Sequence, residues 1–363
     1  MVKNVIIFRY LLKEHLFSFL IVFIFSSLLF FSIDLIELIR RGASKEIDFS
    51  ILIKLAIFHL PSLFPIILPT VFLLGSMNTY MKLNKNNELS VLRGSGFSIW
   101  LLILPAIVNT LIISFVYLFF FNPVFAYMNI KFKNYENTYF KGTSGLYSLS
   151  STGLWLKEKT SSHEYVINAQ NYSSQLKRLK NVIIFKFQDN RFLERIDVEK
   201  VEMINDEKWI LNNGVKLEIN QIPKTFEKYT LDINLSVDKI EQNFRPPETI
   251  SIWALNKYIR DIESSGFSVI KLEIYKNYIY SYPLILIAMV LLGCLLSIRK
   301  ERVKKNIFKI LIGILVGVLY HFISDLIKTL GMTGNLNVFF AVWTSPIILN
   351  LLLISAFIHF EDG

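Results

Sequence analysis

Hydrophobic residues fall in long blocks at both ends of the chain and alternate with polar residues in its middle. A helix that crosses a bilayer needs about 20 apolar residues. Six blocks approach or exceed that length, at residues 16–33, 51–81, 99–121, 275–298, 307–327 and 336–360. Hydrophobic residues are 53% of the 363, and the mean hydropathy is +0.44, above the range of most soluble domains. The pattern predicts an integral membrane protein with six transmembrane helices.

The first block resembles the apolar core of a signal peptide. It is too long for one, lacks a small-residue cleavage site and continues directly into Asp34 and Glu37. We therefore interpret it as an uncleaved first transmembrane helix. Because Glu37 and Arg41 are four residues apart, an ion pair between them is expected where the helix ends.

The second block contains Pro61, Pro65 and Pro69 at intervals of four residues. This spacing puts the three prolines on one face of a helix, where each removes a backbone hydrogen bond. Two interpretations stay open, a helix that flexes in function and a kink that neighbouring helices tolerate.

A short polar stretch at residues 82–98 separates the second and third blocks, with the sequence KLNKNNELSVLRGSGFS. Asn86-Asn87 can cap a helix, and Glu88 then falls in the first turn, where the helix dipole favours a negative charge. Gly94 and Gly96 end the helix. The stretch predicts about two amphipathic turns on the membrane face, on which an ATPase partner can push. An ordinary polar loop is the alternative.

Residues 122–271 change to the alternating pattern of β-strands. The strands are expected near 153–159, 164–168, 181–187 and 214–219, with turns at 189–190, 205–206 and 212–214. Many short strands with such turns predict an all-β sandwich or jelly roll between the third and fourth helices. An amphipathic helix at 251–266 then leads back to the membrane. The predicted domains are 1–121, 122–271 with flanking linkers, and 272–363.

Basic residues give the chain a net charge of +10 and lie beside the apolar blocks. This placement favours anionic membrane lipid over nucleic acid as their partner. The N-terminal segment, residues 82–98 and residues 299–305 carry eleven of them on one side of the membrane, whereas the short loops of the other side hold only Arg40, Arg41, Lys45 and Lys328. The positive-inside rule puts these segments and both termini in the cytoplasm, and the β domain in the periplasm of a cell with two membranes. The single cysteine, Cys294, excludes an intrachain disulfide.

Motifs for chemistry within the chain are missing. The sequence has no GxxxxGK[ST], HExxH, GxSxG or Cys/His cluster, so we expect no catalytic site, ATPase, metal or cofactor. His321 and Asp325 are four residues apart in the fifth block, and this pair is either a proton relay or a hydrated helix end. Gly313 and Gly317 form a GxxxG, which permits close contact between helices.

Three lysines follow the third block, at positions suited to meeting phosphate groups of an anionic lipid. They are Lys131, Lys133 and Lys141. A solvated linker is the alternative interpretation.

The six helices, the inserted β domain and the stretch NELSVLRGSGFS together resemble the lipopolysaccharide-export permeases of the LptF/LptG family. The resemblance covers the whole chain. Gly153-Leu-Trp155 and the end of helix one, with Asp34, Glu37 and Arg40-Arg41, look more like LptG than LptF.

The resemblance implies a permease subunit of an ABC transporter in the cell inner membrane. It implies pairing with a homologous second permease, a dimeric cytoplasmic ATPase as the motor, and lateral entry of lipopolysaccharide. It also implies a periplasmic bridge of jelly-roll proteins that receives the glycolipid. A permease for another lipid or lipoprotein, or a structural anchor of an envelope complex, are the alternatives. The lack of a clustered nucleophile or acid/base pair disfavours a membrane-embedded enzyme.

The resemblance also implies roles for individual residues. Lys133 matches a phosphate-contacting position, whereas Glu136 and Asp34 stand where some members have basic residues. Helices one and five form the lateral gate, with Asp34, Glu37, Gly313 and Gly317 as candidates. Contact with the ATPase falls on Glu88, Leu89, Leu92 and Arg93, with Glu88 pairing an arginine of the ATPase.

Overall fold

The protein is described here from a computed structural model of the 363-residue chain. The structure describes residues 2–362 except 46, 142–146, 151–152, 160–162, 174–177, 189–190, 206–207, 219–220, 234–245, 265–267 and 299–302. The chain divides into two compact units. The membrane unit holds Met1–Tyr135 and Glu273–Gly363, and the β unit holds Glu136–Leu272.

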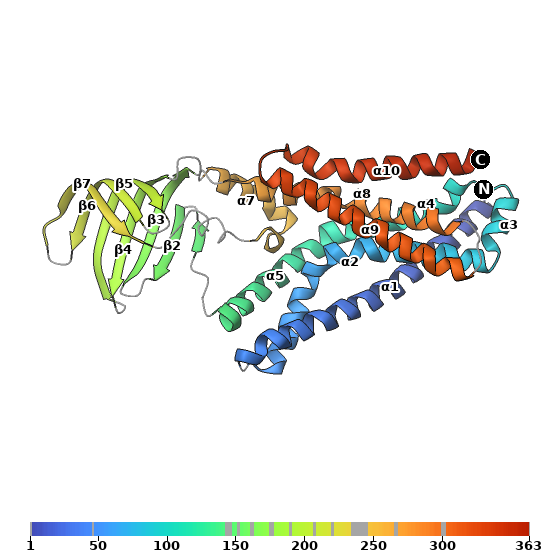
Figure 1. The fold of residues 1–363 in the computed structure, drawn as a ribbon, viewed down its shortest axis with the longest axis horizontal. Coiled ribbons are helices and arrows are strands. Elements are labelled where there is room, and N and C mark those ends of the chain that lie inside the picture. Colours follow the sequence, from blue (N-terminus) through green and yellow to red (C-terminus); the bar gives the residue numbers. More distant parts are fainter. Residues whose placement is uncertain are drawn as a thin grey trace. The chain divides into compact units, whose positions relative to one another are not determined.

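Long apolar helices build the membrane unit (Figure 1). They are α1 (Val2–Gly42), α2 (Phe49–Lys85), α4 (Ile99–Val116), α5 (Asn122–Glu136), α8 (Ile270–Ile298), α9 (Val303–Met332) and α10 (Val338–Asp362), with the short helices η1 (Ala43–Lys45), α3 (Glu88–Gly94) and η2 (Tyr117–Phe121). Within the described residues, six helical segments are long and apolar enough to span a membrane, because α4, η2 and α5 form one continuous segment. This confirms the six predicted spans.

The third span is longer than its apolar block. Helix continues past Phe121 through a π-helical turn and ends only at η3 (Asn137–Lys141). The polar residues after 121 suggested a linker, but the buried positions Ala126, Asn129 and Phe132 recur at helical spacing. The candidate lysines therefore lie on a helix.

The prolines of α2 lie in an unbroken helix. Pro69 has no N–H to offer the carbonyl of Pro65 four residues earlier. The hydroxyl of Tyr282 on α8 donates a hydrogen bond to that carbonyl over 3.2 Å. A neighbouring helix thus satisfies the freed backbone oxygen, which supports the interpretation of a tolerated kink.

The core of the membrane unit lies between α2 and α8. In the most apolar stretch of α8, 72% of the residues are buried, against 11% in α1 and 17% in α9. A Cβ added at Gly293 of α8 would lie 2.6 Å from the carbonyl oxygen of Leu73 on α2. The two helices therefore cross in direct backbone contact, while α1 and α9 present apolar faces to their surroundings.

The β unit is built on one antiparallel sheet. Its described strands are β1 (Tyr147–Ser150), β2 (Gly153–Lys159), β3 (Glu164–Ser173), β4 (Arg178–Gln188), β5 (Arg191–Asn205), β6 (Lys208–Glu218) and β7 (Lys224–Asp232), followed by η4 (Pro247–Thr249) and α7 (Ile252–Ser264). The all-β insertion is confirmed. Its described strands pair in sequence order from β1 to β7, so their connections are those of a meander and not the crossing connections of the expected jelly roll.

One row of residues interrupts the regular pairing of this sheet. Asn181 and Asn213 have left-handed backbones, with φ of 49° and 55°, and no pairing includes them. The strands pair in the same register before and after this row, so the irregularity is not a bulge with an extra residue in one strand. Asn213 was expected in a turn between strands. Instead, β6 runs through it, because Asn tolerates the left-handed conformation inside an irregular strand.

Candidate functional site

The polar stretch between α2 and α4 forms the predicted short helix, α3. It begins at Glu88, as expected, after Asn87 with φ of 62°. The Asn87 side chain makes no cap hydrogen bond, and its backbone carbonyl accepts from Val91 N over 3.1 Å. Gly96 has φ of 88°, a conformation that favours glycine, and Ser98 caps α4. The loop alternative is therefore excluded.

The faces of α3 differ from the expected ones. Leu89 is buried in the core of the membrane unit, and Leu92 is partly buried against it. Val91 is 66% exposed, and Arg93 is also exposed. Leu89 therefore anchors α3 to its own chain, so the expectation that it enters a groove of the ATPase needs correction. The exposed apolar group on this helix is Val91.

Glu88 is held by neighbouring side chains. Its carboxylate accepts hydrogen bonds from the Tyr10 hydroxyl over 2.6 Å and from Asn86 Nδ2 over 3.0 Å. Tyr10 lies 78 residues away on α1, so no local pattern in the sequence predicts this bond. Nearby, Lys82 Nζ lies 2.6 Å from Glu14 Oε2. Polar contacts thus join the start of α1 to the α2–α3 turn.

A cavity of about 420 Å³ opens between α1 and α3. Its lining is mainly apolar, with one carboxylate, and consists of Ile6, Ile7, Tyr10, Asn86, Glu88, Val91 and Leu92. Figure 1 shows α3 beside both chain termini, at one end of the membrane unit. This arrangement suits a protein partner that offers apolar side chains and one cation.

The candidate gate acids lie towards the other end of α1. Asp34 Oδ1 lies 2.8 Å from His59 Nδ1 on α2, and the His59 ring stacks on Phe132 of α5 at 4.2 Å. Asp34 therefore joins three helices of its own chain. Glu37 forms a bidentate pair with Arg40, at 2.7 and 2.9 Å, in place of the expected pair with Arg41.

The candidate phosphate ligands do not form one cluster. Residues two apart on a helix point about 200° apart, so Lys131 and Lys133 leave α5 in nearly opposite directions. Lys131 Nζ lies 5.5 Å from the ring centre of Tyr127, and Lys133 Nζ lies 5.5 Å from that of Phe132. Lys141 ends η3, and its side chain is outside the described part of the chain.

Gly313 and Gly317 face α2 of the same chain. A Cβ at Gly313 would lie 2.9 Å from Met77 Sδ, and one at Gly317 would lie 3.5 Å from Leu73 Cδ2. The small size of Gly313 therefore serves packing within the protomer, because Gly313 is buried, whereas Gly317 is only partly buried and has room for a methyl group. A correction concerns Asp325, whose carboxylate pairs with Lys328 over 2.6 Å and not with His321.

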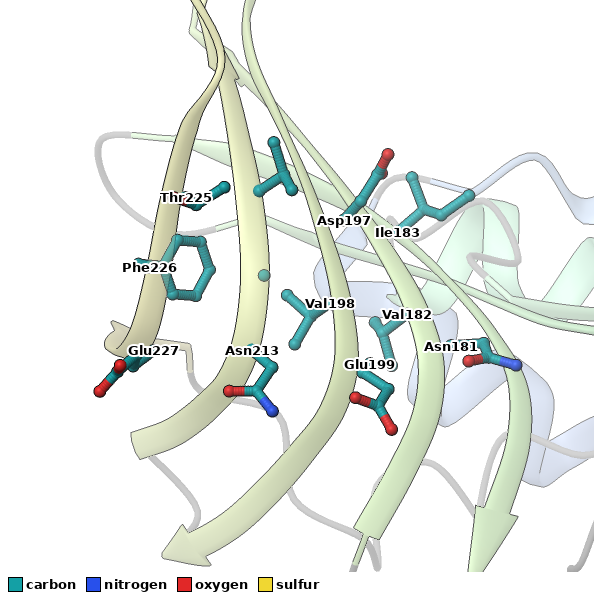
Figure 2. Close-up of a pocket in the computed structure, with 12 residues that line it drawn as sticks. Asn181, Val182, Ile183, Asp197, Val198, Glu199, Asn213, Thr225, Phe226 and Glu227 are labelled. Carbon is teal, nitrogen blue, oxygen red and sulfur yellow. The ribbon is translucent and has the colours of Figure 1, made fainter.

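A second cavity, of about 840 Å³, lies on the sheet of the β unit, along the irregular row. Figure 2 shows Phe226, Val198 and Val182 following one another across neighbouring strands, with Glu199, Asn213 and Glu227 at one end. A Cβ at Gly214 would lie 2.5 Å from Phe226 Cζ, so the ring occupies the space over this glycine. Apolar and polar residues both line the cavity, and acidic side chains lie at both of its ends, Glu199 and Glu227 at one and Asp197 at the other (Figure 2).

Six membrane-spanning segments, a β unit inserted after the third and a short helix held between the second and third define the class of the protein. It is a polytopic membrane protein with an inserted β domain. The chain belongs to the family described as lipopolysaccharide export system permease LptF/LptG, which matches residues 9–359. No curated protein matches the sequence. The chain is thus a transport subunit for lipopolysaccharide export and not a catalytic chain, and permeases of this system work with an ATPase and a permease partner.

Proposed function

We propose that this chain is the LptG-type permease of the inner membrane exporter, with both termini and α3 in the cytoplasm. The subtype is supported by Gly153-Leu-Trp155 and by the Asp34 to Arg41 end of α1. The orientation is supported by the basic residues at the α3 end of the helices. A homologous second permease and a dimeric ATPase complete the transporter, and the β unit lies in the periplasm.

The coupling role rests mainly on one observation: α3 is fixed to its own chain on one side and offers an apolar surface on the other. Leu89 anchors it in the core, and the bond from Tyr10 to Glu88 fixes it to α1. Val91 and the adjoining cavity of about 420 Å³ are open to a partner. A groove of the ATPase binds Val91 and the rim residues Leu92 and Arg93. Movement of this groove pushes on α2 and α4 together, because α3 is connected directly to the end of α2 and to the start of α4.

The substrate route uses both units. The exposed faces of α1 and α9 meet the second permease and the lipid, which makes them the lateral gate. Lys131, Lys133 and Lys141 follow the third span, where phosphates of the glycolipid pass. In the β unit, the cavity beside Phe226 takes acyl chains, since its acidic margin disfavours the phosphorylated end. The last strand of the sheet pairs with the next protein of the periplasmic bridge.

Recovery of the ATPase with the purified permease tests the coupling role. Val91→Glu puts a charge on the proposed contact, and we expect recovery of the ATPase to fall about tenfold or more. Ile222→Glu is the control, because Ile222 is 84% exposed but belongs to the β unit. Equal recovery with both variants would contradict docking at α3.

A further inference from the structure

A buried side chain, Asn84, joins the turn between α2 and α3 to α8. This residue lies in the last turn of α2 and is 7% exposed. Its Nδ2 donates a hydrogen bond to the carbonyl of Ile298 over 2.9 Å, and a second one to the carbonyl of Ser297. Asn84 and these carbonyls are more than 200 residues apart in sequence.

The two carbonyls lie where the described part of α8 ends. Ile298 is the last described residue of that helix, and Ser297 precedes it. Because Ser297 and Asn84 are both buried, water does not replace the bond without cost. The amide of Asn84 thus fixes this part of α8 to the last turn of α2.

The backbone of Asn84 makes the turn to α3. Its carbonyl accepts from the Asn87 N–H over 3.1 Å, and Asn87 is the left-handed residue that reverses the chain before Glu88. One residue therefore bonds α8 through its side chain and the start of α3 through its backbone. Any rotation of α3 about this turn changes the position of the Asn84 amide.

We infer that Asn84 is a positioning residue that makes α8 follow the movement of α3. The inference rests on the proposed docking of the ATPase at α3. Since α8 is the most buried span and packs directly on α2, its displacement changes the core of the membrane unit. Without the Asn84 bonds, α8 follows α3 only through its packing on α2, and less lipopolysaccharide is exported for each ATP hydrolysed.

Asn350 provides a matched control. It is also 7% exposed, and its Nδ2 also donates to two carbonyls, those of Leu284 at 2.9 Å and Pro346 at 2.8 Å. It joins α10 to α8 within the span, away from α3. Asn84→Leu and Asn350→Leu therefore remove the same kind of bond, and only the first removes a link to α3.

The experiment measures lipopolysaccharide released per ATP hydrolysed in proteoliposomes that hold both permeases and the ATPase. We expect Asn84→Leu to retain the ATPase and its hydrolysis but to lower this ratio about fivefold or more, and Asn350→Leu to leave the ratio unchanged. Asn84→Asp keeps the size but loses the donor, so it is expected to uncouple as well, whereas Asn84→Gln keeps the donor and recovers part of the ratio.

An unchanged ratio in both Asn84→Leu and Asn84→Asp would overturn the inference, as would an equal loss in the Asn350→Leu control. If Asn84→Leu does not accumulate in the membrane, the comparison of Asn84→Asp with Asn84→Gln decides. Failure of the proposed docking gives a different result, namely normal recovery of the ATPase with the Val91→Glu variant.

Discussion

Buried polar side chains hold helices of the membrane unit together, and His15 is the clearest case. It is 1% exposed, and both nitrogens are bonded. Nδ1 accepts from Asn109 Nδ2 over 3.0 Å, and Nε2 lies 3.1 Å from Ser76 Oγ, which itself donates to a backbone carbonyl. The ring thus joins α1, α2 and α4 through hydrogen bonds at both nitrogens.

Replacing His15 with Leu should therefore destabilise the chain, because the amide of Asn109 and the hydroxyl of Ser76 lose a buried partner. We expect a loss of about 1–3 kcal/mol, measured as a lower unfolding temperature in detergent. His15→Gln, which retains a donor and an acceptor, is expected to lose less. Equal stability of the Leu variant and the native chain would show that the three-helix link is not needed.

Glu194 plays a similar part in the β unit. It is 6% exposed and lies 2.8 Å from Lys216 and 3.3 Å from Lys186. The hydrogen bond from Lys216 to Glu194 raises the pKa of that lysine, and Lys216 in turn lowers the pKa of Glu218. The contribution of Lys216 to the free energy of unfolding is fully present below the pKa of a lysine in the unfolded chain, about 10.4. The contribution of Glu218 is fully present above the pKa of a glutamate in the unfolded chain, about 4.3. Both are therefore present at neutral pH.

Glu194→Gln should speed hydrogen exchange in β4, β5 and β6 at neutral pH, because two ammonium groups then lose a buried carboxylate. The expected cost is about 2 kcal/mol. Glu199→Gln serves as the control, since its pair with Lys200 is exposed and such pairs contribute little. Exchange that is equal in the two variants would contradict a stabilising role for Glu194.

For the ion pairs, the sequence predicts that a partner exists on the same helix but not which residue it is. Helical spacing correctly indicated that Glu37 and Asp325 have partners on their own helices, but named Arg41 and His321. The structure pairs them with Arg40 and Lys328. Positions three and four residues away are both within reach, and the choice depends on neighbours. Lys328 Nζ, for example, lies 4.4 Å from the centre of the Tyr278 ring on α8.

At the scale of elements, the hydrophobic pattern predicted the six spans, and it predicted β2 at its observed bounds, Gly153–Lys159. It missed α5, because Asn122, Lys131 and Lys133 hide the helical spacing of the buried residues. The start of α3 was predictable from its acidic first turn. Its inward face was not, since the burial of Leu89 depends on helices distant in sequence. Strand order likewise depends on long-range pairing.

An alanine substitution is expected to have different effects on stability at two helix glycines, Gly293 and Gly317. Gly293→Ala should lower the unfolding temperature and the yield of the chain, because the new Cβ would lie 2.6 Å from a backbone carbonyl of α2. Gly317→Ala should be nearly neutral, because its nearest neighbour would be a leucine methyl at 3.5 Å. Both are measured by thermal unfolding in detergent. A tolerated Gly293→Ala would mean that α2 and α8 do not cross as closely as described.

At the scale of the whole molecule, the orientation in the membrane is the first prediction. Cys294 is fully buried, so an added cysteine is the reactive one. Lys85→Cys, beside α3, should be labelled only from the cytoplasm, and Ile222→Cys, in the β unit, only from the periplasm. Periplasmic labelling of the first variant would reverse the orientation and with it the proposed position of the ATPase.

In the proposed mechanism, ATP hydrolysis by a partner drives lipopolysaccharide export through this chain by way of α3. The most direct measurement is lipopolysaccharide release from proteoliposomes that contain the chain, a homologous second permease and the ATPase. We expect release that requires ATP and falls about tenfold or more when Val91 is changed to Glu, with Ile222→Glu as active as the native chain. Release that persists undiminished in the Val91→Glu variant would contradict this mechanism.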